Sequence, residues 1–208
     1  MEYKTIFNVE SSENTYLLFD EETRNGIIID PGIDIDKIER FIKDNNVNLK
    51  YILLTHCHYD HITSLIPLKE KTNALVVAGD KGSNNIGDPK KNLSLQGLGY
   101  EIKEICADII LKDGDVLELN NLKIKCIYTP GHTECGVCYL VENELFAGDT
   151  FFLRSCGRWD LPTGDFKTLE KSIKEKLYTL PDETVVHSGH GHDTTIGYEK
   201  KYNFCVTL

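Results

Sequence analysis

The sequence predicts one domain of mixed α and β structure in which helices cover the outer faces of β-sheets. Short β-branched or aromatic runs alternate with amphipathic helical patterns, and two of the runs are joined by a hairpin-like turn. The 208 residues, of which 40% are hydrophobic, are enough to build a sizeable core. No linker-like segment and no solenoid or propeller repeat divides the chain. We therefore expect a single α+β domain over residues 1–208.

The N-terminal part of the chain alternates predicted strands with predicted helices. Strands are indicated by short apolar runs between polar turn residues, at positions 6–9, 15–19, 26–29, 51–54 and 75–78. Asp34 or Asp36 is expected to cap a helix, because the apolar residues that follow share one helical face. A short helix is expected from Ile62 until Pro67 breaks it. Residues 79–99 are rich in Gly, Asn, Ser, Asp and Lys, which predicts a long loop.

The C-terminal part repeats this mixture and adds a hairpin. Its predicted strands lie at 116–119, 123–128, 137–141, 144–147 and 184–186. Glu142 and Asn143 separate two of these strands and predict a tight hairpin turn. An apolar stripe at helical spacing predicts a helix over 166–177, closed by Pro181, and a last short helix is expected over 195–202.

Composition and charge exclude several classes of function. The formal net charge of −10 at pH 7 argues against a nucleic-acid surface, which needs clustered basic residues. The apolar runs are far shorter than the ~20 residues of a membrane span, so we expect no membrane association. The N-terminus shows no signal-peptide pattern. The seven cysteines lack the regular spacing of a disulfide-stapled secreted domain, which favours reduced cysteines and a cytoplasmic location.

Histidine and aspartate residues follow four of the predicted strands, at the point where each strand ends. The segment 56–61 reads His-Cys-His-Tyr-Asp-His, and His132, Asp149 and His190 each follow a later strand. Loop residues at strand ends converge in space even when they are far apart in the sequence. Imidazole nitrogen and carboxylate oxygen are good ligands for Zn²⁺. Any one of these histidines alone would more often be a structural residue, but the joint pattern predicts a metal site.

The expected ligands are numerous enough for two open metal sites. They divide into two groups with one bridging carboxylate: His56, His58 and His132 for one ion, Asp60, His61 and His190 for the other, and Asp149 between them. A catalytic ion keeps one position free for water or substrate. The pattern therefore indicates a catalytic rather than a purely structural centre.

Several segments, in this order, resemble the metallo-β-lactamase superfamily. They are IIIDPG (27–32), THCHYDH (55–61), TPGHT (129–133), FAGDT (146–150) and SGHG (188–191). The resemblance covers nearly the whole chain and implies a four-layer αββα sandwich with a metal cleft along one edge. It also implies that Asp30 supports the metal-binding loops by orienting a ligand, as carboxylates around metal sites commonly do.

Two further segments resemble the hydroxyacylglutathione hydrolase (glyoxalase II)-like branch in its short bacterial form. They are SCGRWDLPTGD (155–165) and GHGHDTTIGYEKKYN (189–203). The resemblance implies hydrolysis of small acyl thioesters by a hydroxide that bridges two divalent ions, with zinc expected and iron or manganese as alternatives. Asp60 would be the catalytic residue that orients this hydroxide while it binds metal. A thiolate leaves without a separate general acid, because thiol pKa values are about 8.5.

The expected partner is a small anionic acyl-thiol, and two arginines are the candidates to contact it. Arg154 and Arg158 follow Asp149 closely, and a guanidinium pairs well with a carboxylate, although structural ion pairs are an equal alternative. The sequence departs from the branch at Cys135, which stands where a glycine is usual. Cys135 and Cys138 match C-x-x-C without a second pair, and we assign them no function. The pattern does not predict an oligomeric state.

Three other functions stay open on the same residues. Persulfide dioxygenases share the H-x-H-x-D-H loop and a segment like LRSCGRWD (153–160), and by resemblance would hold one iron with His56, His132 and Asp149. A lactonase or β-lactamase on the same fold is a second alternative, and a metal-binding module without turnover is a third. The segment 79–99 is interpreted either as a lid over the cleft or as a plain connector.

Overall fold

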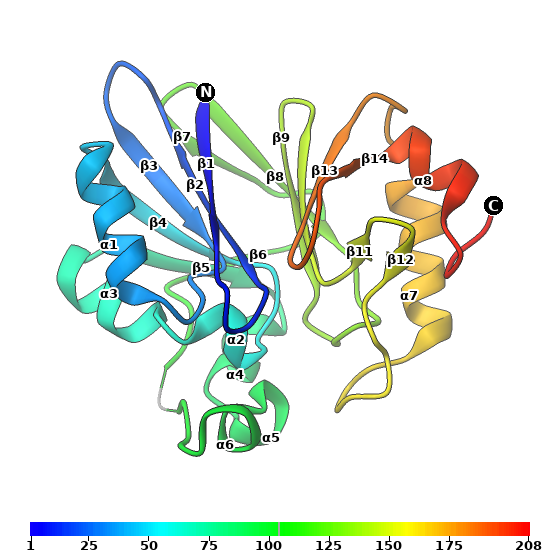
Figure 1. Ribbon diagram of the computed structural model, residues 1–208, viewed down its shortest axis with the longest axis horizontal. Coiled ribbons are helices and arrows are strands. Elements are labelled where there is room, and N and C mark those ends of the chain that lie inside the picture. The colour runs from blue at the N-terminus through cyan, green and yellow to red at the C-terminus, as the bar shows by residue number, and fades with distance from the viewer. Residues whose placement is uncertain (104) are drawn as a thin grey trace.

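In the computed structural model, two six-stranded β-sheets pack face to face and helices cover the outer face of each sheet (Figure 1). The structure describes residues 1–103 and 105–208. The order of the layers is helix, sheet, sheet, helix, which confirms the predicted αββα sandwich. Among the described residues, no helix combines the length and the apolar character that crossing a bilayer requires.

The first sheet is built by the N-terminal half of the chain. Its strands, in spatial order, are β1 (Glu2–Phe7), β2 (Asn14–Phe19), β3 (Asn25–Ile29), β4 (Asn48–Leu54), β5 (Leu75–Gly79) and β6 (Ile109–Leu111). Strands β1 to β3 are antiparallel, and β3 to β6 are parallel. Helices α1 (Ile35–Asp44) and α3 (Leu65–Thr72) pack on its outer face. Because side chains alternate along a strand, Leu17 packs under these helices while Leu18 faces the second sheet.

The second sheet is built by the C-terminal half. Its strands, in spatial order, are β14 (Thr194–Thr195), β13 (Val185–Ser188), β10 (Glu144–Gly148), β9 (Val137–Val141), β8 (Leu122–Tyr128) and β7 (Val116–Leu119). Helix α7 (Phe166–Ser172), continued by a π-helical turn over Ile173–Leu177, and helix α8 (Ile196–Tyr202) cover its outer face. The predicted hairpin at Glu142 and Asn143 is confirmed, since Val141 pairs with Glu144.

The prediction that residues 79–99 form a long loop is wrong. The segment 79–99 contains the short helices α4 (Gly82–Ile86), α5 (Pro89–Asn92) and α6 (Ser94–Leu98). Its polar residues form hydrogen bonds that stabilise these short helices. The Asp88 side chain accepts from the backbone N–H of Lys90, and the Asn92 amide donates to the carbonyls of Ile86 and Ile102. The polar composition of this segment indicated a loop, but the same polar side chains stabilise the ends of short helices.

Pro67 does not break a helix, because it lies at the third residue of α3. In the first turn of a helix the backbone N–H groups have no intrahelical partner, so a proline there sacrifices no hydrogen bond. The preceding turn forms a separate helix, α2 (Tyr59–Ile62). The first strand ends at Phe7 rather than Val9, and β6 and the small hairpin of β11 (Phe151–Phe152) and β12 (Ser155–Cys156) were not predicted.

Candidate metal centre

Strand direction brings the predicted ligands to one edge of the two sheets. Strand β9 lies antiparallel between β8 and β10, and β13 runs parallel to β10, so β8, β10 and β13 all end at the same edge. The end of β4 meets this edge from the first sheet, where the Val137 backbone N–H donates to the Thr55 carbonyl at 2.8 Å. The loops that follow these strands carry all seven predicted ligands.

His56, His58 and His132 form the first ligand group. One nitrogen from each lies within 4.8 Å of the others, and all three side chains are buried. His132 Nδ1 donates to the Arg158 carbonyl at 2.7 Å, which leaves Nε2 unprotonated and 2.9 Å from His58 Nδ1. Burial lowers the pKa of His58 to about 3 and that of His56 well below its usual range. These imidazoles are neutral, the form that binds a metal ion.

Asp60, His61 and His190 form the second ligand group, which is more open to solvent. Their candidate ligand atoms also lie within 4.8 Å of one another. His61 Nε2 lies 3.3 Å from His190 Nε2, which in turn lies 3.4 Å from a carboxylate oxygen of Asp60. Burial opposes protonation of His61, but the carboxylates of Asp149 and Asp60 outweigh it and raise the His61 pKa.

Asp149 lies between the two groups, as predicted. Its Oδ1 is 3.4 Å from His61 Nε2, and its Oδ2 is 3.6 Å from both His132 Nε2 and His190 Nε2. Burial works against ionisation of this carboxyl, yet His61 and the neighbouring imidazoles lower its pKa well below the usual range. One carboxylate therefore contacts members of both ligand groups.

Asp30 contacts a ligand rather than the space between the groups. Its carboxylate accepts hydrogen bonds from the backbone and hydroxyl of Thr55, at 2.7 and 2.5 Å, and lies 3.0 Å from His61 Nδ1. This contact leaves His61 Nε2 directed toward His190. Asp30 thus has the position that the resemblance implied, although it also lies close enough to His56 and His61 to form a third potential ligand set.

Unpaired buried atoms show that the residues fit a metal ion. Among the described residues, six buried side-chain nitrogen or oxygen atoms have no hydrogen-bond partner, and three of them lie here: His56 Nε2, His58 Nε2 and Asp149 Oδ1. An unpaired buried polar atom costs about 1–3 kcal/mol, so three in one place need a compensating partner. A divalent cation coordinated by nitrogen and oxygen would supply it.

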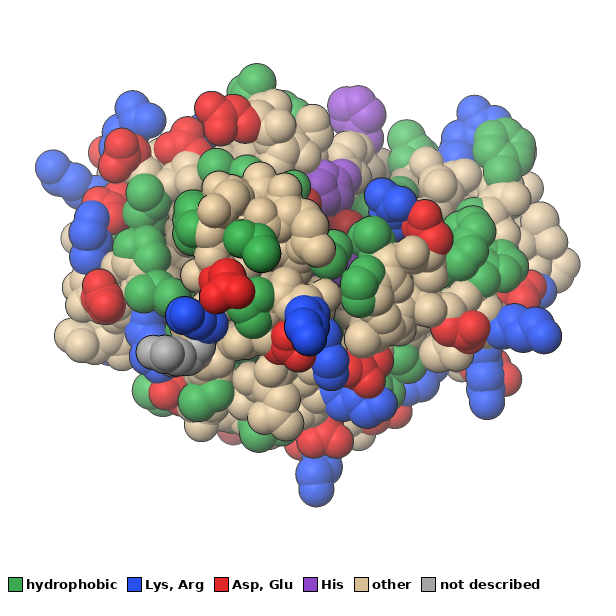
Figure 2. All heavy atoms as spheres, turned by 90° about the horizontal axis from the view of Figure 1, so that it is seen from below, with side chains coloured by type: hydrophobic (Ala, Val, Ile, Leu, Met, Phe, Trp, Pro, Cys, Tyr) green, Lys and Arg blue, Asp and Glu red, His purple; other side chains and the backbone are tan. Residues whose placement is uncertain are grey.

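A cavity of about 510 Å³ opens beside these ligands. Residues outside the ligand set contribute to its wall: Tyr59, Leu93, Phe152, Ser155, Cys156, Arg158 and Leu161. Figure 2 views the molecule from this edge, where histidine side chains are visible next to acidic and apolar ones. Sequence reasoning identified only Arg158 among these wall residues. Cys156 and Leu161 lie in the segment 155–165 that carries the resemblance, but they were assigned no role there. Leu93 was missed because helices α5 and α6, which bring it to the wall, were not expected.

The sequence of residues 9–190 matches the family model of the Metallo-beta-lactamase superfamily. The chain belongs to this superfamily. It is accordingly a metallo-hydrolase of a family that binds divalent metals, and the His and Asp groups described above are suited to hold them.

Three relatives show how far the similarity extends. The hydroxyacylglutathione hydrolase GloC of Haemophilus influenzae is 33% identical, over 92% of this chain and 91% of its own. The crystal structure of the BLEG-1 B3 metallo-β-lactamase has a TM-score of 0.93 at 33% identity and covers 100% of both chains. The structure of ETHE1 from Myxococcus xanthus has a TM-score of 0.83 at 32% identity, over 98% of this chain and 84% of its own. These three relatives share one fold but are named for different activities or families.

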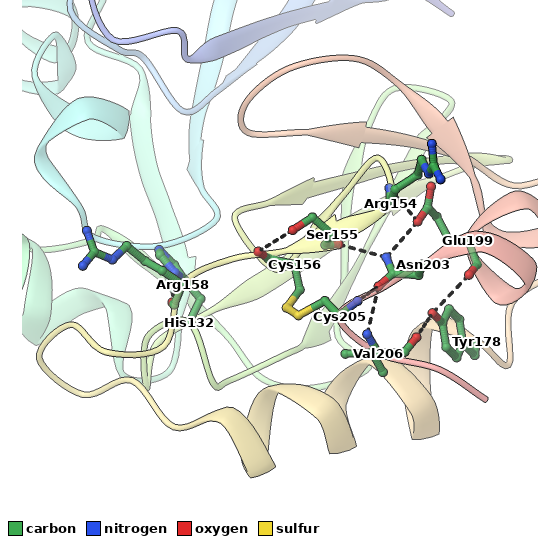
Figure 3. The surroundings of a disulfide bond; sticks show 10 residues. All are labelled: His132, Arg154, Ser155, Cys156, Arg158, Tyr178, Glu199, Asn203, Cys205 and Val206. Atoms are coloured by element: carbon green, nitrogen blue, oxygen red, sulfur yellow. Dashed lines mark hydrogen bonds between the residues drawn. A yellow bond between two sulfur atoms is a disulfide. The ribbon is translucent and has the colours of Figure 1, made fainter.

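The two arginines predicted to contact substrate in this metallo-hydrolase lie at opposite ends of the β11–β12 hairpin (Figure 3). Arg158 lines the cavity next to His132, and its guanidinium forms two hydrogen bonds, of 2.8 and 2.7 Å, with Asp160. Arg154 instead stacks over the ring of Phe204 at 4.4 Å and is not part of the cavity wall. The structure therefore brings one of the two arginines to the site.

The expectation that all cysteines are reduced is wrong for one pair. Cys156 of the cavity wall forms a disulfide with Cys205 of the C-terminal tail (Figure 3). The two are 49 residues apart and follow no spacing rule, so their pairing depends on α8 returning the tail to this hairpin. Cys135 and Cys138 are buried free thiols, and they contact Thr133 and Thr129 respectively.

Proposed function

We propose that this protein hydrolyses small anionic acyl thioesters with two divalent ions. The observation that carries the proposal is the position of Asp149, whose oxygens lie within 3.6 Å of imidazole nitrogens in both ligand groups. A carboxylate that reaches both groups is well placed to bridge a pair of neighbouring ions. The name of the similar GloC protein, hydroxyacylglutathione hydrolase, supports the thioester class of substrate.

Different residues of this centre would bind the ions and orient the attacking water. The first ligand group would hold one ion, the second group the other, and Asp149 would bridge them. A bound divalent ion lowers the pKa of a coordinated water from 15.7 to about 7 and polarises a carbonyl oxygen. Asp60 lines the cavity beside His190 and would orient the attacking water through a hydrogen bond to its carboxylate. The leaving thiolate needs no protein acid, because thiol pKa values are about 8.5.

The cavity suits a small substrate with an apolar part and an anionic part. Its volume of about 510 Å³ is in the usual range for small-molecule sites. Leu93, Phe152 and Leu161 offer apolar contact to an acyl or thiol chain. Arg158 would bind the substrate carboxylate after exchange from Asp160, because an exposed ion pair is worth only about 0–1 kcal/mol.

The test combines metal analysis with turnover. Elemental analysis of purified protein should find two divalent ions per chain, with zinc expected and iron or manganese as alternatives. Steady-state assays with S-lactoylglutathione and other acyl-thiols should show hydrolysis that chelation and His56→Ala abolish. His192→Ala removes an exposed histidine outside the ligand groups and should retain activity. Metal-loaded protein without turnover on any acyl-thiol would contradict the proposal.

A β-lactamase activity is the second candidate, and one observation favours it. The BLEG-1 structure, named as a B3 metallo-β-lactamase, superposes over the full length of both chains. The same purified protein should therefore be assayed with a chromogenic β-lactam. Oxygen uptake with glutathione persulfide by the iron-loaded protein tests the dioxygenase resemblance, for which His56, His132 and Asp149 would hold the iron. Preference for either substrate over every thioester would replace the proposed function.

A further inference from the structure

The turn between β1 and β2 lies against the loop that follows β13, although the two belong to different sheets (Figure 1). Glu13 and His190 form an isolated antiparallel bridge, and the Asn14 backbone N–H donates to the Gly189 carbonyl at 2.8 Å. The first sheet thus reaches across the sandwich to contact the loop that carries a ligand of the second group.

The side chain of Asn14 forms hydrogen bonds with this loop on both sides of His190. Its amide donates to the carbonyls of Ser188 and Gly191, each at 3.0 Å, and the side chain is 4% exposed. The hydroxyl of Tyr16, two residues further along β2, donates to the same Ser188 carbonyl at 2.6 Å. Backbone carbonyls that accept these bonds cannot rotate freely, so the path of residues 188–191 is fixed from outside the loop.

The same turn determines which nitrogen of His190 is available to a metal ion. His190 Nδ1 lies 3.0 Å from the carbonyl oxygen of Ser12. A carbonyl can only accept, so Nδ1 carries a proton, and Nε2 is the nitrogen left to bind a metal ion when the ring is neutral. Nε2 is the atom that faces His61 and Asp60. Loop path and ring tautomer are therefore both set by residues 12–16.

We propose that Asn14 is a positioning residue for His190 and hence for the ion bound by the second ligand group. The inference rests on the proposed two-ion function. Asn14 acts through the backbone of the loop rather than by contact with metal or substrate. The first ligand group has its own support in the Arg158 carbonyl, which accepts from His132. Loss of the Asn14 amide should therefore affect one ion and spare the other.

The test measures zinc affinity by competition with a chromophoric chelator, and cobalt absorbance as a second readout. Asn14→Ala should weaken one zinc ion about 10- to 100-fold, the usual cost of losing a group that orients a ligand, and leave the other at wild-type affinity. In the cobalt protein only one of the two metal signals should change. Tyr16→Phe, which removes one hydrogen bond to the same loop, should weaken the same ion by a smaller factor.

Asn92→Ala is the matched control. Asn92 is also buried and also donates to two backbone carbonyls, at 2.7 and 2.8 Å, but these belong to Ile86 and Ile102. It should lower the melting temperature while both ions keep their affinity.

The outcomes separate this inference from the proposed function. Two ions at wild-type affinity in Asn14→Ala, or an equal loss of both ions, would overturn the positioning role alone. If Asn14→Ala does not fold, Tyr16→Phe decides by the same measurement, and unchanged affinities there overturn the role. A wild-type protein that binds fewer than two ions would overturn the proposed function and this inference with it.

Discussion

The two ligand groups of the centre differ in burial and in the way that the fold supports them. His56, His58 and His132 are all buried and are supported within their own edge of the sandwich. In the second group the side chains of Asp60 and His190 are 19% and 26% exposed, and His190 is held by a turn of the opposite sheet. If each group binds one ion, as proposed, the two ions would therefore not be equivalent. The ion of the second group should exchange with solvent more readily.

The largest effect should come from removing the residue that the groups share. Asp149→Ala deletes the carboxylate that contacts His61, His132 and His190. We expect loss of both ions and a fall in kcat/KM larger than the 10- to 100-fold that is typical of outer contacts. Metal content and steady-state kinetics measure both effects. Retention of two ions by this variant would show that Asp149 does not bridge the groups.

Single-ligand variants should separate the groups. His190→Ala should lose the exchangeable ion and keep the buried one, so that dialysis against a chelator shows one slow step instead of a fast and a slow one. His56→Ala should show the reverse pattern, with the slow step lost. Metal content followed over time during dialysis is the measurement. Identical time courses for the two variants would remove the distinction between the groups.

A smaller effect is expected where a residue acts through a ligand. Asp30→Ala removes the partner of His61 Nδ1 and of the Thr55 backbone. We expect the second ion to bind about 10- to 100-fold more weakly. The first ion should weaken by a smaller factor, because Thr55, which Asp30 holds, also contacts His56 Nδ1 at 3.1 Å. Asp165→Ala is the control, since it removes the side chain that caps α7, costs about 1 kcal/mol of stability and belongs to neither ligand group. Equal zinc affinities in both variants would argue against the support role of Asp30.

The sequence predicted the ligands of these groups better than their supports, for physical reasons. Residues 56–61 place four candidate ligands in one loop after a buried strand, so their pattern is local. His132, Asp149 and His190 were assigned to the same centre because each follows a predicted strand. The common direction of β8, β10 and β13 brings them to one edge, as that argument requires.

Supports depend on contacts between distant parts of the chain. The Asn14 amide donates to the Gly191 carbonyl across 177 positions, whereas in the sequence Asn14 only ends a polar stretch that is typical of a turn. Arg154 and Arg158 were equal candidates for substrate contact in the sequence. The small β11–β12 hairpin places Arg158 at the cavity and Arg154 against Phe204. Predicting such features requires the packing of the two sheets, which periodicity does not determine.

The smallest effect concerns a histidine that is buried like the first ligand group but is surrounded by carboxylates. His187 lies on β13, with Nε2 2.6 Å from Glu144 and Nδ1 3.1 Å from Asp193. Burial works against protonation, but these carboxylates outweigh it and raise the His187 pKa above its usual value. The charged form therefore stabilises the fold below pH ~6.5, the ordinary histidine pKa, and this contribution is lost as the pH rises through the raised pKa.

His187→Gln removes the titrating group while keeping a side chain that can hydrogen-bond to Glu144 and Asp193. The free energy of unfolding should fall by about 1 kcal/mol at pH 5.5, and the difference from wild type should shrink toward pH 9. Urea unfolding across this range measures it, and zinc stoichiometry at pH 7.5 should be unchanged because His187 is in neither ligand group. A difference independent of pH would mean that His187 is held as a neutral residue. In that case burial, and not the neighbouring carboxylates, would govern the protonation of His187.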